Sequence, residues 1–247
     1  MQAGIRAGII GVTGACFVAV SIAVGQYGDI SDLKILKPED KVDIRSEDAP
    51  VGAIVLFDGK NFDNWTKTDG KSPPGWKIVH GAMEVVPRTG NIMTKQRFEG
   101  KFKLHVEFRV PYMPQAQGQA RGNSGVYVQG RYEVQILDSY GLKSQKNDCG
   151  AIYDIAAPRI NACKAPTIWQ SYDIIFQAPV CEQGRKKLPA RMTVYHNGVR
   201  IHDDVAIPVD NTRAGLGGDP CTPGPVMLQD HGDPVQFRNI WLLPLRD

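Results

Sequence analysis

KFKLHVEFRV, residues 101–110, alternates apolar and polar side chains along its whole length. The apolar positions are Phe102, Leu104, Val106, Phe108 and Val110. Successive side chains of an extended chain point to opposite faces, so this period of two predicts a β-strand with one face on a hydrophobic core.

Shorter stretches of the same kind occur on both sides of this segment. Asn197-Gly198 separates two of them and predicts a hairpin, because Asn and Gly tolerate the positive φ of a type I′ turn. No stretch shows a sustained helical period. The expected fold is therefore all-β, a jelly-roll sandwich of two antiparallel sheets. Further strands are expected over residues 76–80, 82–86, 125–129, 132–137, 172–177, 191–196, 199–203, 226–229 and 235–243.

The composition agrees with many short strands joined by turns. The 247 residues include 26 Gly and 17 Pro, more than the roughly 12% of average usage. A hydrophobic content of 42% and a charged content of 22% fit a globular protein and exclude wholesale disorder, a multispan membrane protein and a coiled coil. The net charge of +3, without a run of basic residues, gives no indication of a nucleic-acid-binding surface. The sequence does not indicate the oligomeric state.

The N-terminal region divides into two parts. Residues 1–25 have the form of a secretory signal peptide, with Arg6, an apolar stretch over 7–24 and a small-residue site before Gln26. An uncleaved membrane anchor is the alternative reading, and a lipoprotein site at Cys16 is disfavoured by the apolar residues after it. Residues 26–51 read as a charged tether and 52–247 as the folded domain, so we expect a periplasmic or secreted protein without membrane contact after cleavage.

Four cysteines remain after signal cleavage, and an exported chain favours disulfides among them. Of the three possible connectivities we favour Cys149 with Cys163 and Cys181 with Cys221, which close two separate loops. A zinc site is the alternative, but no CxxC pair and no His at ligand spacing accompany the cysteines.

One strand carries a row of polar side chains on the face opposite its apolar residues. Period two places Glu133 and Gln135 on one face of residues 132–137, with Val134 and Ile136 on the other. Such a row is too polar for a sandwich interior. It is either a solvated face or the floor of a concave binding site.

A bulge near Leu137 would return Asp138 to the face of Glu133. The pattern Glu133-x-Gln135-x-x-Asp138 then looks like the bulged acid motif of the β-jelly-roll glucanases, with Gln135 in place of the middle acid. A retaining glycosidase needs carboxyls about 5 to 5.5 Å apart, whereas five residues of strand span roughly 16 Å. The pattern thus favours a sugar cleft over ordinary glycosidase chemistry.

Two further polar groups have both a functional and a plain reading. His231 lies in a Gly/Pro/Asp loop and is either an accessible acid or base or a solvated turn residue. Arg121 and Arg238 are either surface residues or forked donors to sugar hydroxyls or an oxyanion.

Six blocks in this order resemble the 3-keto-disaccharide hydrolase family over about residues 52–244. They are LFDGK (56–60), RGNSGVY (121–127), YEVQILDS (132–139), CGAIY (149–153), WQSYD (169–173) and LQDHG (228–232). The resemblance implies a concanavalin A-like jelly roll. Phe62 and Asn64 depart from the Leu and Gly expected before Trp65, which affects an edge turn only.

The resemblance also implies a carbohydrate substrate and a reaction. A ketone at sugar C3 acidifies the C2 proton, so a general base can remove it and the glycosidic oxygen can leave C1 by elimination, with possible hydration afterwards. By this reading Glu133 or His231 is the base, Asp138 is a second acid/base, and Arg121 and Tyr153 are donors to the enolate. The expected hydroxyl-binding side chains are Asn123, Gln135, Gln229 and Arg238.

A divalent cation (Ca²⁺, Mg²⁺ or Mn²⁺) held by Glu133, Asp138 or His231 would fit the same reading, although no cofactor is required by it. Two other functions stay open from the sequence. A non-catalytic carbohydrate-binding module would bind sugar without turnover, and a conventional retaining β-glucanase would cleave unoxidised glucans.

Overall fold

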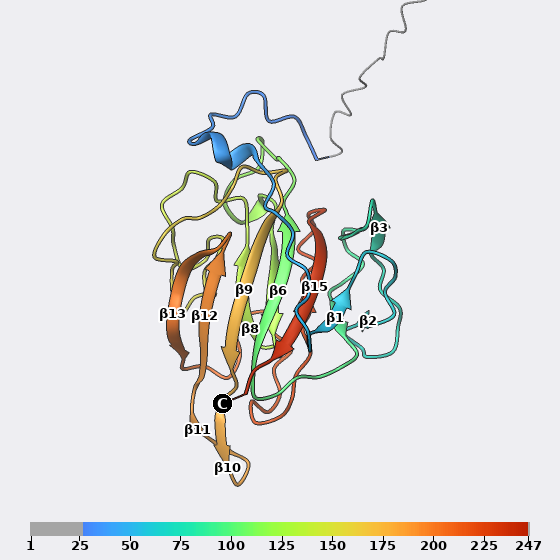
Figure 1. Cartoon of the computed structure of the whole chain (residues 1–247), viewed down its shortest axis with the longest axis vertical. Coiled ribbons are helices and arrows are strands. Elements are labelled where there is room, and N and C mark those ends of the chain that lie inside the picture. The colour runs from blue at the N-terminus through green and yellow to red at the C-terminus, as the bar shows by residue number, and fades with distance from the viewer. Residues whose placement is uncertain (1–26, 247) are drawn as a thin grey trace, which may run out of the picture.

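The computed structural model describes residues 27–246, and the expected signal peptide lies outside them. Within this range the chain is almost entirely strands and loops, with two short 3-10 turns at Pro38–Lys41 and Gly118–Ala120 (Figure 1). No helix in this range is long and apolar enough to span a bilayer. The strands are β1 (Ile54–Phe57), β2 (Trp65–Lys67), β3 (Lys77–Val79), β4 (Ala82–Glu84), β5 (Ile92–Thr94), β6 (Lys101–Arg109), β7 (Ser124–Val128), β8 (Tyr132–Ile136), β9 (Gln170–Gln177), β10 (Val180–Glu182), β11 (Arg185–Leu188), β12 (Ala190–His196), β13 (Val199–Ile207), β14 (Met227–Leu228) and β15 (Gln236–Pro244).

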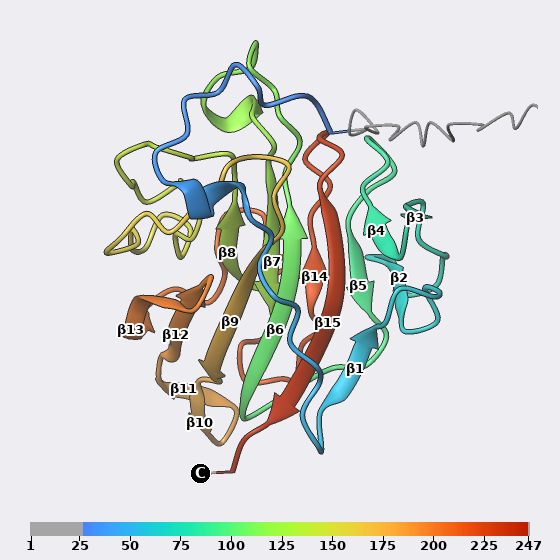
Figure 2. The ribbon, with the colours of Figure 1, turned by 45° about the horizontal axis from the view of Figure 1, so that its top comes forward.

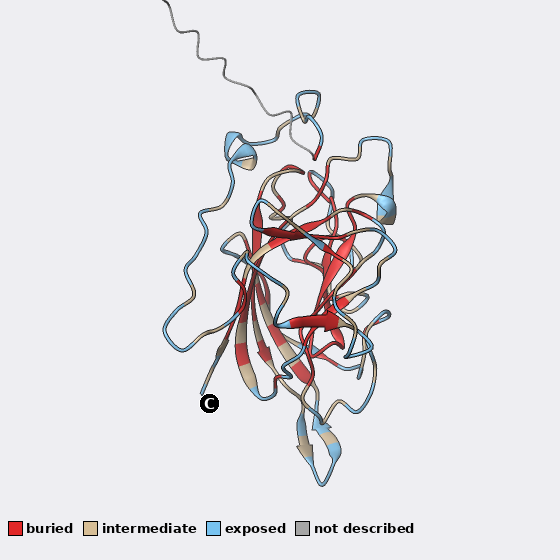
Figure 3. Cartoon of the chain, turned by 90° about the vertical axis from the view of Figure 1, so that its right-hand side faces the viewer, coloured by how far each residue is buried: buried red, intermediate tan, exposed pale blue. Residues whose placement is uncertain are grey.

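Two antiparallel sheets form the sandwich, which confirms the expected all-β jelly-roll class. The larger sheet has eight strands in the order β13-β12-β9-β6-β15-β4-β3, with β1 also paired to β15. The smaller has five in the order β2-β5-β14-β7-β8. The hairpin β10-β11 stands apart and projects from one end of the molecule (Figure 1). The buried residues are concentrated on the strands of the two sheets (Figure 3), and their hydrophobic side chains form one large core cluster.

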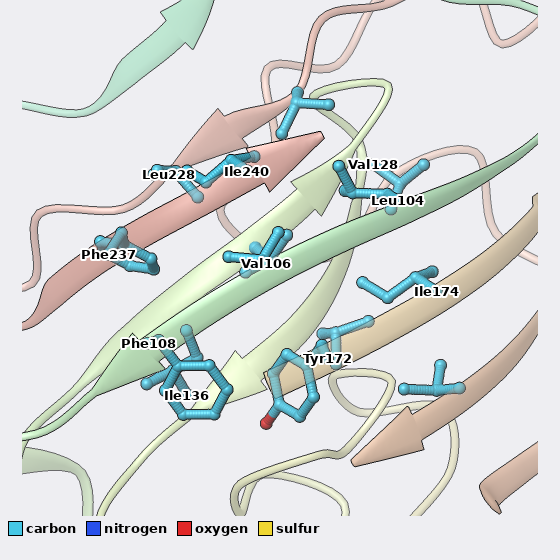
Figure 4. Close-up of a cluster of buried hydrophobic side chains, with 14 of the residues drawn as sticks. Leu104, Val106, Phe108, Val128, Ile136, Tyr172, Ile174, Leu228, Phe237 and Ile240 are labelled. Atoms are coloured by element: carbon cyan, nitrogen blue, oxygen red, sulfur yellow. The ribbon is translucent and has the colours of Figure 1, made fainter. Parts of the chain in front are cut away.

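The alternation in residues 101–110 forms one side of this core. Leu104, Val106 and Phe108 of β6 point inward and are fully buried (Figure 4). Val128 of β7 and Ile136 of β8 belong to the same cluster of side chains (Figure 4). The predicted strand and its inward face are therefore confirmed.

The other face of β6 is also covered, which its polar residues did not predict. His105 and Glu107 are 1% and 0% exposed. Residues 27–50, read from sequence as a tether, first lie over one end of the molecule and, after the 3-10 turn at Pro38–Lys41, run across this outer face in front of β9 and β6 (Figure 2). The Ile44 amide donates to the Trp169 carbonyl, and the Ser46 hydroxyl donates to the Glu107 carboxylate. We call residues 27–50 the N-terminal strap.

The hairpin predicted at Asn197-Gly198 forms there, and a second hairpin that the sequence did not predict joins β7 to β8. Asn197 and Gly198 have φ of 52° and 77° between β12 and β13. Gln129 and Gly130, with φ of 51° and 65°, make the equivalent turn between β7 and β8. This second hairpin brings the polar row of β8 beside β7.

One of the two favoured disulfides is present. Cys181 and Cys221 are bonded, whereas Cys149 and Cys163 are free and buried. The prediction for the second pair is thus corrected. Its two sulfurs and His196 lie within 4.8 Å of one another, and Cys149 Sγ contacts the Tyr172 hydroxyl at 3.1 Å, so the thiols pack as part of the core.

Candidate active site

The hairpin β7–β8 forms the floor of a cavity on the side of the smaller sheet that faces away from the core. Val134 and Ile136 of β8 enter the core, so Glu133 and Gln135 point the other way. The polar row is therefore buried at the floor of a hollow and is not a solvated face. The cavity has a volume of about 80 Å³ and is lined by Gln119, Asn123, Glu133, Gln135, Tyr153, Arg213, Ala214, Gln229 and His231.

Glu133 is the single carboxylate among these lining residues, and it is 2% exposed. Burial raises the pKa of its carboxyl, the hydrogen bond from the Tyr127 hydroxyl lowers it, and the charge of Asp154 raises it further, to about 7. Tyr127 in turn accepts a hydrogen bond from Gln229 Nε2 at 3.1 Å. Glu133 can therefore exchange a proton near neutral pH, as a general base must.

A glycine on the neighbouring strand makes room for this carboxylate. A Cβ atom at Gly125 of β7 would lie 2.5 Å from Glu133 Oε1 and 2.9 Å from the Tyr127 ring. Real Cβ atoms essentially never approach other atoms so closely. A side chain at residue 125 would therefore displace the Glu133 carboxylate or the Tyr127 ring from its place.

The backbone of Glu133 is held from two sides. Its N–H donates to Thr212 Oγ1 at 3.1 Å, and its carbonyl accepts from the Tyr153 N–H at 3.1 Å. The Gln135 N–H donates to the Ala151 carbonyl at 2.9 Å. Two loops that supply lining residues are therefore attached directly to the strand that carries Glu133.

Amide side chains form one wall of the cavity. Gln119 links two other amides of this wall, Asn123 and Gln135. Its backbone carbonyl accepts a hydrogen bond from Asn123 Nδ2 at 2.7 Å, and its Oε1 accepts one from Gln135 Nε2 at 3.0 Å. Asn123 Oδ1 and Gln229 Oε1 are buried without a hydrogen-bond partner. A buried acceptor without a partner is costly, so these two oxygens suit the hydroxyl donors of a ligand.

His231 stands at the mouth of the cavity and is exposed. It also lines a second, open hollow of about 860 Å³, together with Arg88, Asp230 and neighbouring loop residues. The Asp230 carboxylate accepts from the Gly90 N–H at 2.9 Å and the Gly232 N–H at 3.0 Å, which fixes the two loops around His231. The imidazole therefore borders both the small cavity and the open hollow.

Arg121 and Asp138 do not line the cavity. Asp138 is 5% exposed, and its Oδ2 lies 3.0 Å from Arg121 Nε. Burial raises the pKa of Asp138, and the charge and hydrogen bond of Arg121 oppose this. The chain turns after β8, with the Ser139 N–H donating to the Leu137 carbonyl, and the Asp138 N–H donates to the Arg121 carbonyl. This turn directs Asp138 to Arg121 instead of to the face of Glu133.

The predicted set of metal ligands is therefore not assembled. Among the described residues, Glu133, Asp138 and His231 do not form a group whose ligand atoms lie within 4.8 Å of one another. Asp138 also has a guanidinium as its partner, which occupies the place of a cation. These three side chains therefore do not form a common site for a divalent ion.

Arg238 lies on the opposite side of the molecule, so its prediction as a substrate-binding residue is wrong. Its neighbour Phe237 enters the core, and alternation along β15 turns Arg238 outward beneath the N-terminal strap. There its Nε donates to Glu107 Oε2 at 2.6 Å, and its guanidinium stacks on the Trp169 ring at 4.1 Å.

Glu133, His231, Tyr153, Asn123, Gln135 and Gln229 are brought together as expected. Sequence reasoning missed Gln119, Gly125 and Arg213. Gln119 lies in a short 3-10 turn and Arg213 in a loop, and neither segment has a periodicity that indicates which side chain faces the cavity. Gly125 was quoted in a motif, but its role depends on the register that places it beside Glu133.

A two-sheet antiparallel sandwich with an amide-lined cavity on one sheet is typical of carbohydrate-binding and carbohydrate-active jelly-roll proteins. Residues 52–243 match the model of the 3-keto-alpha-glucoside-1,2-lyase-like domain, and the chain belongs to this family.

Solved structures agree with this assignment. A candidate glycosyl hydrolase from Parabacteroides distasonis is 36% identical, with a TM-score of 0.70 over 80% of this chain and 85% of that chain. A second from the same organism, 19% identical, has a TM-score of 0.60 over 86% of this chain and 99% of that chain and shows the fold alone. No curated protein sequence matches the chain significantly.

Proposed function

We propose that the protein cleaves glycosides already oxidised at sugar C3, by removal of the C2 proton and elimination of the group at C1. The observation that carries the proposal is Glu133, a buried carboxyl with a pKa of about 7 on the floor of a cavity lined by amides. Family membership supports a 3-keto-glycoside as the substrate class.

In the first step the Glu133 carboxylate takes the C2 proton. The electron pair of the C–H bond moves into the C2–C3 bond, and the C3 carbonyl becomes an enolate. The pair then returns, the carbonyl re-forms, a double bond forms between C1 and C2, and the C1–O bond breaks. Addition of water across this double bond completes a net hydrolysis.

The remaining lining residues suit the other tasks of this reaction. His231, at the mouth, can donate a proton to the departing glycosidic oxygen. Asn123 Oδ1 and Gln229 Oε1 can accept hydrogen bonds from sugar hydroxyls, which fixes the ring over Glu133. The Tyr153 hydroxyl is a candidate donor to the C3 oxygen.

This arrangement favours elimination over the two alternative functions. A retaining glucanase needs a second carboxyl about 5 to 5.5 Å from the first, and Glu133 has no such companion among the lining residues. A module that only binds sugar gains nothing from a carboxyl whose ionised form is destabilised by burial. A general base gains a pKa close to the working pH.

The test compares a glucoside with its 3-keto derivative and follows both release of the leaving group and deuterium incorporation at C2 in D₂O. Release and exchange are expected from the 3-keto compound alone, and both should be lost in Glu133→Gln. Release from the plain glucoside alone, or from neither compound, contradicts the proposal.

We also propose that the mature protein is periplasmic or secreted. The Cys181–Cys221 disulfide supports this, because such bonds persist in oxidising compartments. N-terminal sequencing of protein recovered from the periplasm and medium of an expressing bacterium should show cleavage before Gln26; recovery of the uncleaved chain in the cytoplasm contradicts it.

A further inference from the structure

We propose that Arg213 is a catalytic residue, the cation that stabilises the enolate formed at C3. This inference rests on the proposed elimination reaction. Of the two residues predicted to stabilise the enolate oxygen, Tyr153 lines the cavity, but the cationic one, Arg121, does not.

Arg213 lines the same small cavity as Glu133. Of the nine lining residues it is the one with a permanently charged cationic side chain. Arg121 lies outside the lining and is committed to Asp138 through its Nε, which contacts both Oδ2 and the backbone carbonyl of that residue. The charge that an enolate requires is therefore supplied at this cavity by Arg213.

The loop that presents Arg213 is firmly built. The neighbouring Thr212 is buried, its N–H and hydroxyl both donate to the Arg131 carbonyl at 2.8 Å, and its Oγ1 accepts the Glu133 N–H. Arg131 is buried in turn and donates to carbonyls of Gly217, Asp219 and Thr222. Base and cation are thus joined through one residue, Thr212, which is adjacent to Arg213 in sequence and bonded to Glu133.

The guanidinium itself is only loosely held. Its Nη2 lies 3.6 Å from Asp154 Oδ2, and the two side chains are 76% and 52% exposed. An exposed ion pair at this distance contributes little, so the guanidinium can turn to a ligand at small cost. Tyr153, beside Asp154, lines the cavity as well, and its hydroxyl and the Arg213 fork can serve the same oxygen.

With Glu133 as the base and Arg213 as the cation, the proton and the negative charge formed in the first step each have a partner in the cavity. The C2 proton goes to Glu133 and neutralises its carboxylate, while the negative charge moves to the C3 oxygen. Donors that act on this oxygen stabilise the transition state more than the neutral ketone, so their loss lowers kcat. Removal of a buried oxyanion donor typically costs 10²- to 10³-fold in kcat. Because Arg213 is largely exposed, we expect a fall of roughly 10- to 100-fold.

The experiment measures kcat, KM and C2 deuterium exchange of the full-length protein on a 3-keto-glucoside for wild type, Arg213→Ala and Arg213→Lys. Arg200→Ala is the matched control, because Arg200 is also an exposed arginine paired with an aspartate, at 3.1 Å from Asp203, and lies on β13 away from the cavity. Arg213→Ala should lower kcat and the exchange rate together, with partial recovery in Arg213→Lys and on addition of guanidinium ion to Arg213→Ala. Arg200→Ala should match wild type.

The possible failures are distinguishable. A wild type that turns over no 3-keto-glucoside refutes the proposed function itself. An active wild type with Arg213→Ala within twofold of it in kcat, or with KM alone changed, overturns the role of Arg213 and leaves the elimination reaction standing.

Discussion

Replacement of Glu133 by Gln should abolish turnover and at the same time stabilise the fold above neutral pH. Burial and the charge of Asp154 disfavour the ionised carboxyl, so folding works against the state that the reaction needs. The glutamine side chain has nearly the same shape and carries no charge at any pH. The variant therefore removes the base and the cost of ionising it together.

The size of both effects follows from the pKa. A rise from the ordinary value of 4.5 to about 7 corresponds to about 3 kcal/mol in favour of the neutral carboxyl in the folded protein. Between these values the folded protein binds a proton that the unfolded chain has lost, so the free energy of unfolding of wild type falls as pH rises. Glu133→Gln should thus gain up to about 3 kcal/mol relative to wild type above pH 7 and nothing below pH 4.5. In wild type about 1% of the Glu133 carboxyl is ionised at pH 5 and half of it at pH 7. Because only the ionised carboxylate can act as the base, kcat/KM should be about 50-fold lower at pH 5 than at pH 7.

Two assays check this reasoning. Urea denaturation of wild type and Glu133→Gln at pH 4.5, 6 and 8 gives the difference in stability, and a pH series on a 3-keto-glucoside gives the acid limb of kcat/KM. Glu99→Gln, at an exposed position away from the lining residues, is the control. A stability difference that stays constant with pH, or a kcat/KM that is unchanged from pH 5 to 7, refutes the assignment of Glu133 as a base destabilised by burial.

Other changes test the surroundings of the site and the sheet. Gly125→Ala should lower kcat/KM about 100-fold, because the new Cβ atom displaces the Glu133 carboxylate and a misplacement of about 1 Å costs this much. Steady-state kinetics measure the loss, and an unchanged circular dichroism spectrum shows that the variant is folded. Near-normal kinetics would contradict the prediction. Burial raises the pKa of Glu107, but hydrogen bonds from His105, Asn239, Ser46 and Arg238 outweigh this and lower it to about 2. The ionised Glu107 carboxylate therefore stabilises the fold fully above pH 4.5, and this stabilisation is lost toward pH 2. Glu107→Gln should lower the free energy of unfolding in urea by about 3 kcal/mol at pH 7. An equal loss at pH 7 and pH 2.5 would show that ionisation of Glu107 is not the cause. Cys181→Ser opens a loop of 40 residues and should lower the free energy of unfolding by about 4 kcal/mol, seen as a lower Tm. An unchanged Tm would show that the bond adds nothing to stability.

The parts of the structure that follow from local pattern were predictable. Period two in residues 101–110 and the turn at Asn197-Gly198 depend on steric rules that act within a few residues, and both were confirmed. The row of Glu133 and Gln135 was assigned to the correct face of its strand for the same reason. The same alternation along β15 turns Arg238 outward, but it was not applied to this residue, and it could not show that the N-terminal strap covers that face.

Features that depend on contacts between distant segments were not predictable. The pKa of Glu133 requires burial by loops that lie 20 to 80 residues away in sequence, such as those of Tyr153 and Arg213. Asp138 could have joined Glu133 only through a bulge, and the turn that occurs instead places it against Arg121, which is distant in sequence. Arg213 carries no local signal, because its importance comes from the bond between Thr212 and Glu133.

The position of β15 has a consequence for how the molecule can be made. This strand, at residues 236–244, lies in the interior of the larger sheet and pairs with β6, β4 and β1. Until it is in place, β6 with its neighbours β9, β12 and β13 has no hydrogen-bonded connection to β3 and β4, so the larger sheet exists as separate pieces with open edges. A chain that ends before Gln236 should therefore fail to assemble and tend to aggregate. Folding is complete only when the first and last strands to be synthesised, β1 and β15, have paired.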